Sequence, residues 1–405
     1  MSRLPGNWKL CPIHEYIWTE SSNHLCAEVS VSMKELQEIL RAYEAIKRAE
    51  GKAILATVVN VKGSTYRRPG ARLLIRQDGT TIGAISSGCL EADVVERAKK
   101  VMDSSNAITV VYDLTESQDD VWGLNLGCSG VIHVLLEPLP LSTRSLHLKS
   151  LADCMDSQKT GVLASVFRVE GEFKATIGSH LLLLEDGSVA EDIKNPTLSA
   201  ALTEDCLAAL RSRNTRVNEY RFTEGVVTAL IEVIRPPLPL VIIGAGADSV
   251  PLARFAKELG WTVTVVDHRP AFISRERFPQ ADALILARPE EITDKLTIKG
   301  NTLVVIMTHD FSHDLQLLRS ILPSSAQYVG ILGPSKRTEL LLEKVRESGF
   351  IPSAKQVDRL HGPVGLNIGA ESPEEIALSI LSEIQAFLNG RNGGFLRDHG
   401  GPIHA

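Results

Sequence analysis

A duplication in the first half of the chain constrains its fold more than any other feature of the sequence. The segment ILATVVNVKGSTYRRPGARLLIRQDGTTIG, which starts at Ile54, matches VLASVFRVEGEFKATIGSHLLLLEDGSVAE, which starts at Val162, without a gap. Each segment has two strand-like runs around a turn and then an Asp-Gly turn, a pattern typical of β-hairpins. A helical run and another strand pair follow in both. Copies at about 53–140 and 161–237 therefore predict an α+β domain of two degenerate repeats over residues 34–237.

Copy one carries turns that copy two lacks. It has STYRRP at 64–69 where copy two, 108 residues later, has EFKATI, and it has Gly88-Cys89 where copy two has Pro-Thr. Matching Glu137 with Arg235, at an offset of 98, predicts ten extra residues in copy one. The segment DVWGLNLGCSG, which contains Cys128, is the expected place for them.

Residues found in one copy only are candidates for function, and the drift of surface loops is the alternative. Glycine lets a backbone approach a ligand closely, and arginine forks are suited to phosphate or another anion. We therefore expect a single site built by copy one. Its candidate residues are Ser64, Arg67, Arg72, Gly88, Cys89 and Cys128.

The thiol of Cys89 has two interpretations. The preceding Ser-Ser-Gly predicts a turn into a helix, and the positive end of a helix dipole favours the thiolate. The alternative is a small buried apolar residue, which cysteine often is. Cys154 and Cys206 are expected on helical faces with structural roles.

From Leu238 the pattern changes to alternating buried strands and helices, which predicts a Rossmann-like doubly wound parallel sheet over 238–389 and an α/β protein as a whole. Gly244 and Gly246 follow a strand and open a helix, as in a dinucleotide-binding turn. Asp267 ends the next strand and has the place of a ribose-binding acid. Ser249 replaces the third glycine, so a fold without a nucleotide remains the competing interpretation.

Two further segments of the second half predict helix starts. Ser335 is expected to cap a helix after a strand, where Lys336 would complete an anion site. Ser372 is expected to cap another helix, with Glu375 closing a capping box. A glycine-rich tail covers 390–405.

Composition excludes several classes of protein. The formal net charge is -6, so nucleic acid is not an expected partner, and no apolar run approaches the roughly 18 residues of a membrane span. The N-terminus has no signal-like apolar run, and six scattered cysteines do not form a disulfide framework, so we expect a cytoplasmic protein. The extension 1–33 holds Cys11, His14, His24 and Cys26 at a spacing unlike common closed zinc sites.

The motifs resemble those of one family. GSTYRRPGARLLI, SSGCLEADV and GLNLGCSG resemble the N-terminal module of XdhC/CoxI-type proteins. VIIGAGADSVPLA, VVDHRPAF, YVGILGPSKR and PVGLNIGAESPEEIALSI resemble the Rossmann-like domain of that family, in the same order. Two departures stand out: Ala247 occupies a position that is usually histidine, and Ser129 interrupts a usual Gly-Cys-Gly-Gly.

This resemblance implies an accessory factor that binds molybdenum cofactor (molybdopterin) and assists its sulfuration and insertion into a xanthine dehydrogenase-type apoenzyme. It implies a chaperone rather than a catalytic subunit, with Cys89 and Cys128 as contacts to the metal. A cysteine desulfurase and a second copy of the chain are the other candidate partners. The alternative function is an NAD(P)-dependent oxidoreductase that uses the Rossmann-like domain, against which Ser249 counts.

Overall fold

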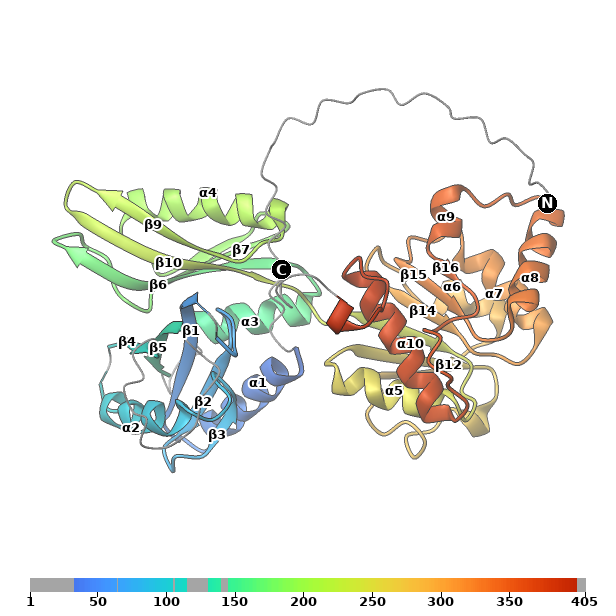
Figure 1. Cartoon of the computed structure of the whole chain (residues 1–405), viewed down its shortest axis with the longest axis horizontal. Coiled ribbons are helices and arrows are strands. Elements are labelled where there is room, and N and C mark those ends of the chain that lie inside the picture. The colour runs from blue at the N-terminus through green and yellow to red at the C-terminus, as the bar shows by residue number, and fades with distance from the viewer. Residues whose placement is uncertain (1–32, 64, 105, 115–129, 140–144, 399–405) are drawn as a thin grey trace, which may run out of the picture.

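A computed structural model of the chain describes residues 33–63, 65–104, 106–114, 130–139 and 145–398. They form two stacked α+β modules followed by a parallel-sheet domain (Figure 1). The predicted site residues Ser64 and Cys128, and the Cys/His group of the N-terminal extension, lie outside the described residues.

Both modules have one topology, which confirms the predicted duplication. Their sheets have the strand orders β3-β2-β1-β5-β4 and β8-β7-β6-β10-β9, and a helix precedes each first strand. Copy one consists of α1 (Met33–Arg48), β1 (Ala53–Gly63), β2 (Arg72–Arg76), β3 (Thr81–Gly83), α2 (Glu91–Val101), β4 (Ile108–Asp113) and β5 (Gly130–Pro138). Copy two consists of α3 (Leu146–Ser157), β6 (Gly161–Gly171), β7 (His180–Leu184), β8 (Val189–Glu191), α4 (Pro196–Ser212), β9 (Arg216–Phe222) and β10 (Gly225–Ile234).

The strand register corrects the predicted match at the end of the repeat. Leu55 of β1 pairs with Glu137, and its counterpart Leu163 of β6 pairs with Glu232, so the last strands match at an offset of 95 rather than 98. The strands β4 and β9 still match at 108. The difference between 108 and 95 gives copy one 13 extra residues rather than ten, all in the connection between β4 and β5, where Cys128 was expected.

The two modules share one hydrophobic core. Leu36 and Ile39 of α1, with Leu55 of β1, pack in one buried cluster with Leu148 of α3 and Leu163 of β6. The helices α2 and α4 cover the opposite faces of their sheets, each with a core of its own. Each sheet is therefore covered on both faces, which explains the near-continuous burial along β1 and β6.

The second domain is a six-stranded parallel sheet in the order β13-β12-β11-β14-β15-β16, the order of the doubly wound dinucleotide-binding fold. One core lies under α5 and α10, and the other lies under α7 and α8. Its strands are β11 (Pro239–Ile243), β12 (Thr262–Asp267), β13 (Ala283–Leu286), β14 (Leu303–Ile306), β15 (Tyr328–Ile331) and β16 (Leu360–His361). Its α-helices are α5 (Ser249–Glu258), α6 (Ile292–Lys295), α7 (Phe311–Ile321), α8 (Ser335–Glu347), α9 (Ala354–Asp358) and α10 (Pro373–Leu388).

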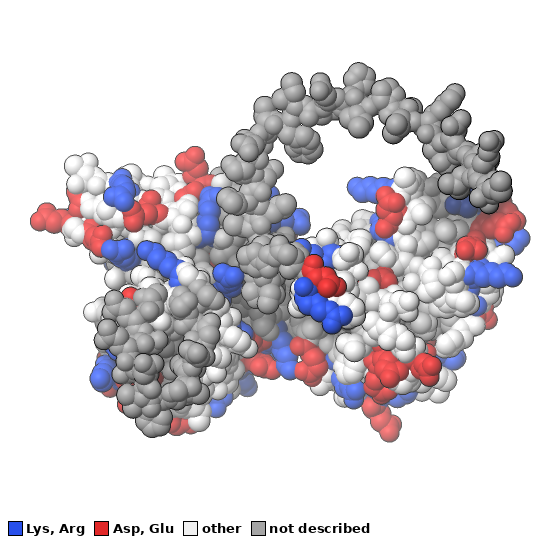
Figure 2. All heavy atoms as spheres, in the orientation of Figure 1, with Lys and Arg blue, Asp and Glu red and all other residues white. Residues whose placement is uncertain are grey.

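Surface charge is mixed in sign. Lys and Arg side chains are interspersed with Asp and Glu over the face drawn in Figure 2. Among the helices of the described residues, none has the length and apolar character needed to cross a bilayer.

Candidate functional site

The two turns that distinguish copy one meet at the first turn of α1. Glu35 accepts a hydrogen bond at 2.6 Å from the backbone N–H of Ala84, on the way to Cys89. Its other carboxylate oxygen pairs with Arg67 of the polar turn at 2.5 Å. Both side chains are largely buried, so water weakens this pair less than it weakens an exposed one. Glu35 therefore holds the Arg67 turn and the Cys89 turn together.

The Cys89 turn is also fixed from its other side by α2. Glu91 accepts hydrogen bonds from the N–H groups of Ile85 and Ser86, and Ser86 Oγ accepts from the N–H groups of Gly88 and Leu90. Burial opposes the ionisation of Glu91, but the hydrogen bonds from Ser86 outweigh it and lower the pKa of this carboxyl. Gly88 has a φ of 109°, which favours glycine.

The thiols of the described residues differ in their exposure to solvent. Cys89 is exposed and lies two residues before the first residue of α2, so the interpretation as a buried filler is wrong for this residue. Cys154 and Cys206 are fully buried on α3 and α4, and burial raises the pKa of each thiol to about 12. Within the described chain, Cys89 is thus the thiol that a ligand can reach.

The prediction that Arg72 binds a ligand anion is wrong. Its side chain is 1% exposed, and its guanidinium donates to Glu232 at 2.9 and 2.5 Å, to the carbonyl of Gly70 and to His147. Since four of its five N–H donors are bonded inside the protein and the side chain is buried, this arginine is not available to a ligand. Arg67 is half-buried and paired with Glu35, and it stays a candidate.

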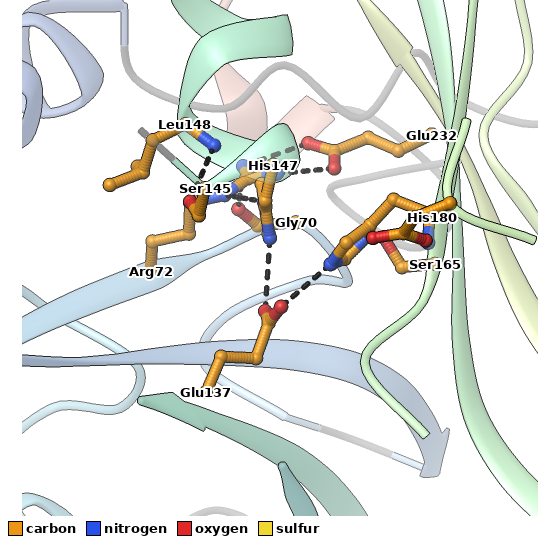
Figure 3. Close-up of polar contacts among 10 residues, drawn as sticks. Gly70, Arg72, Glu137, Ser145, His147, Leu148, Ser165, His180 and Glu232 are labelled. Carbon is orange, nitrogen blue, oxygen red and sulfur yellow. Dashed lines mark hydrogen bonds and ion pairs between the residues drawn. The ribbon is translucent and has the colours of Figure 1, made fainter. Parts of the chain in front are cut away.

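Arg72 belongs to a buried polar network between the modules, shown in Figure 3. Arg72 of copy one pairs with Glu232 of copy two, while His180 of copy two pairs with Glu137 of copy one at 2.6 Å. His180 is the counterpart of Arg72 at offset 108, and Glu232 is the counterpart of Glu137 at offset 95. The repeats therefore exchange equivalent ion pairs across their interface, and His147 bridges the two.

Protonation in this network follows from its donors. Arg72 Nε donates to His147 Nε2, so the proton of a neutral His147 is on Nδ1 and is donated to Glu137 at 2.9 Å. Burial lowers the pKa of His147, in agreement with a neutral ring. Burial also disfavours a charged His180, but the charge and hydrogen bond of Glu137, together with the charge of Asp192, outweigh that effect and raise its pKa.

Glu137, His147 and His180 also place three ligand-type atoms within 4.8 Å of one another, and in the described residues this is the one group with metal-ligand geometry. A metal on His147 Nδ1 would displace its proton to Nε2, where the N–H would point at the Nε–H of Arg72. Two donors cannot share that contact. The donor set therefore fits a closed network of hydrogen bonds better than a metal ion.

Copy two has a cavity where copy one has its candidate turns. It measures about 420 Å³, and Thr176 and Asn195 in its lining are the counterparts, at offset 108, of Arg68 and Ser87. The corresponding positions of copy one lie on its two candidate turns.

The glycine turn of the second domain has the predicted form. Gly244 has a φ of 110°, and a Cβ there would lie 2.6 Å from the carbonyl oxygen of Met307. At Gly246 a Cβ would meet only His309, at 3.8 Å. Ser249, at the third glycine position, is fully buried and donates to the carbonyl of Gly246 at 2.8 Å, so close packing of α5 survives the replacement.

Asp267 does not offer its carboxylate to a ribose. It accepts from the N–H of Ala245 at 2.7 Å, from the N–H of Arg269 at 2.9 Å and from the Arg269 guanidinium at 3.0 and 2.8 Å. Burial opposes its ionisation, but these hydrogen bonds, led by that of Arg269, hold its pKa down at about 2. A ribose would have to displace Arg269, so the structure does not support the predicted contact.

At the predicted anion site that follows β15, Pro334 rather than Ser335 is the N-cap of α8, and no side chain caps this helix. Ser335 is the first helical residue, so its predicted capping role is wrong. Lys336 is exposed, whereas Arg337 is bound to Asp314 at 2.6 Å.

The predicted site residues lie in two groups. Arg67, Gly88 and Cys89 lie on the two turns that Glu35 joins. Gly244 and Asp267 lie at the carboxyl ends of their strands, in the other domain.

Comparison with known proteins agrees with this architecture. The model of the "XdhC and CoxI family" matches residues 46–113 and again residues 154–221, which is the offset of 108 seen in the repeat. The model of the "XdhC Rossmann domain" matches residues 240–384. The chain belongs to the XdhC and CoxI family.

Named members of this family are similar over most of the chain. A Bacillus subtilis protein, named as a probable xanthine dehydrogenase subunit, is 34% identical over 84% of this chain and 94% of its own length. The Escherichia coli "Molybdenum cofactor insertion chaperone PaoD" is 25% identical over 85% of this chain and 86% of its own. A crystal structure described as a xanthine dehydrogenase from Bacillus halodurans has 30% identity and a TM-score of 0.69 over 90% of this chain and 98% of that one.

The carboxylates that organise the site of this XdhC and CoxI family member were not among the predicted residues. Glu35 lies outside the matched segments of the repeat, and nothing in its spacing points to Arg67 or Ala84. Glu91 had a signal, because a glutamate in the first turn of a helix commonly bonds backward to the preceding turn. The network at Arg72 also had a signal: VLLE at 134–137 matches ALIE at 229–232 and would have aligned Glu137 with Glu232.

Proposed function

We propose that this protein binds molybdenum cofactor in copy one, holds it for sulfuration and passes it to a xanthine dehydrogenase-type apoenzyme. The observation that carries the proposal is the joining of the Arg67 turn and the exposed Cys89 turn on Glu35, in a family whose members include a named cofactor insertion chaperone. A cysteine desulfurase and a second copy of the chain are proposed as further partners.

The residues of copy one fit the chemistry of the cofactor. Molybdopterin supplies a phosphate and a metal held by sulfur. A thiol is a suitable soft ligand for such a metal, and Cys89 is exposed. Guanidinium groups bind phosphate in two-pronged fashion, and Arg68 is exposed beside the half-buried Arg67.

The roles of the chain's own residues follow from their contacts. Cys89 would contact the cofactor through sulfur, and Arg67 and Arg68 would bind its anionic part. Gly88 leaves the approach open, since a Cβ there would meet no atom within 4 Å. Ser86 and Glu91 fix the backbone on both sides of Gly88, so the thiol is held in place before a ligand arrives.

Equilibrium binding of purified molybdopterin to the full chain tests the proposal. Cys89→Ser should weaken binding about tenfold, the order expected when one good ligand contact is lost. Glu96→Gln is the control, because Glu96 is an exposed residue of α2 in the same copy, outside both turns, and should leave the affinity unchanged. Unchanged affinity in a Cys89→Ser, Cys128→Ser double variant would remove the thiols from the proposal.

The alternative function, an NAD(P)-dependent oxidoreductase, has the strand order and the glycine turn in its favour, but two sets of side-chain contacts count against it. The acid that would bind the ribose is engaged by Arg269. In addition, Arg277 donates to the carbonyls of Ala245 and Gly246, so the glycine turn is already held by a side chain.

A further inference from the structure

The first turn of α1 contacts both domains of the chain. Lys34 and Gln37, three residues apart on one face of the helix, contact the last residue of α5 and the turn between α5 and β12. Glu35, between them in sequence, points to copy one. We infer that this turn of α1 couples the Rossmann-like domain to the Cys89 turn, and that Glu35 is a positioning residue for Cys89. The contacts are independent of the proposed function, and only the role of Cys89 as a cofactor ligand rests on it.

The contact with the Rossmann-like domain is close enough to transmit a displacement. Lys34 forms an ion pair with Glu258, and Gln37 Nε2 donates to the carbonyl of Gly260 at 3.2 Å. A Cβ at Gly260 would lie 2.4 Å from the backbone nitrogen of Lys34 and 2.8 Å from the carbonyl carbon of Met33. The two backbones therefore touch, and either one must move when the other does.

The contact with copy one is specific to that copy. In copy two, Asp192 donates its backbone N–H to the carbonyl of His180 at 3.1 Å and so continues the sheet. The counterpart of Asp192 at offset 108 is Ala84, and its N–H is donated to Glu35 instead. Because Glu35 binds the N–H of Ala84, the segment that leads to Cys89 leaves the sheet at the position where copy two continues it.

From Ala84 onward, side chains bind most of the backbone N–H groups that lead to Cys89. Glu35 holds the N–H of Ala84, and Glu91 holds those of Ile85 and Ser86. Ser86 then holds Gly88 through its hydroxyl. A shift of α1 would therefore reach the thiol through a segment in which four of the five residues 84–88 donate their N–H groups to these side chains.

The rate at which iodoacetamide alkylates Cys89 in the full chain, read by mass spectrometry of its peptide, tests the inference without cofactor. Glu35→Ala removes both contacts and should change the Cys89 rate about tenfold. Glu35→Gln keeps an acceptor for Ala84 and should give an intermediate rate. Arg41→Ala, at an exposed position of the same helix, is the control and should leave the rate unchanged. The buried Cys154 and Cys206 should stay unreactive in all variants, which shows that the fold is intact.

Coupling between the domains is tested by a double-mutant cycle. Lys34→Ala with Gln37→Ala removes two side-chain contacts to the Rossmann-like domain and should change the Cys89 rate by about threefold. In the Glu35→Ala background the same pair of substitutions should have no further effect, because the path to Cys89 is already broken. Equal effects in both backgrounds, or no effect in either, would overturn the inference. Loss of cofactor binding is a separate measurement, so the proposed function can fail while this inference stands.

Discussion

Arg72 and His180 occupy equivalent positions in the two repeat copies, and each pairs with a buried carboxylate through a different chemical group. Each is a buried cation that needs a carboxylate, and each takes it from the other module. Arginine keeps its charge at any physiological pH, whereas the charge of histidine depends on its neighbours. The network is therefore permanently charged in one half and titratable in the other.

The titratable half predicts a pH dependence of stability. Although burial opposes a charged ring, Glu137 raises the pKa of His180 above its ordinary 6.5. Its stabilisation is therefore complete below pH 6.5 and is lost as the pH rises through the folded pKa. Glu137→Gln removes the attraction and should abolish this alkaline loss. The measurement is the free energy of urea unfolding between pH 6 and 9 for both proteins; equal alkaline slopes would contradict the assignment.

On the acid side, His147 acts in the opposite direction. Burial lowers its pKa below 6.5, so the unfolded chain takes up a proton there that the folded chain does not. Stability should therefore also fall as the pH drops below 6.5. Glu137, whose pKa His180 and His147 keep well below 4.5 despite burial, adds a further loss below that value.

Among the local elements, helix starts show what a sequence can predict. Ser372 caps α10 with Glu375 in a capping box, as predicted, because all the atoms involved lie within four residues. Ser335 was expected to cap α8 by the same rule, yet Pro334 takes the cap position with a φ of -69°. A proline directly before the serine moved the start of the helix by one residue.

The strand-turn-helix element at Gly244 predicts unequal roles for its two glycines. Gly244→Ala places a Cβ 2.6 Å from the carbonyl oxygen of Met307, directly after β14, at a φ of 110° and should destabilise the domain by about 1–3 kcal/mol. Gly246→Ala meets only a side chain at 3.8 Å and should be nearly neutral. Thermal unfolding of the two variants measures the difference. Equal midpoints would show that the turn tolerates a side chain at Gly244.

The long-range contacts could not be predicted from the sequence, for a physical reason. The repeat did predict the strands, because hairpin patterns are local and occur twice. The partner of Arg72 lies 160 residues away, and the partner of Arg67 lies on a helix that precedes the matched segments. Charge alone does not tell a buried pair from a ligand contact, and so Arg72 was assigned wrongly.

For the molecule as a whole, the exchanged pairs make the two modules one cooperative unit. Each module contributes one carboxylate and one cation to the other, and both contribute to one shared core. Among the described residues, the Rossmann-like domain meets α1 through an exposed ion pair, a side-chain hydrogen bond and a close backbone contact. Exposed pairs contribute little to stability, so we expect the two modules to open together and the Rossmann-like domain to open separately.

Hydrogen exchange of two variants of copy two tests this division. Glu232→Gln removes the charge that pairs with Arg72, so amide exchange should rise in β7 of copy two and equally in β2 of copy one. Asp205→Asn is the matched control, because its partners Arg216, Asn218 and Tyr220 all lie in copy two. It should raise exchange in β9 alone, and β14 of the Rossmann-like domain should stay protected in both. Exchange confined to copy two in the Glu232→Gln protein would mean that the modules open independently, since a broken cross-module pair would then leave copy one untouched.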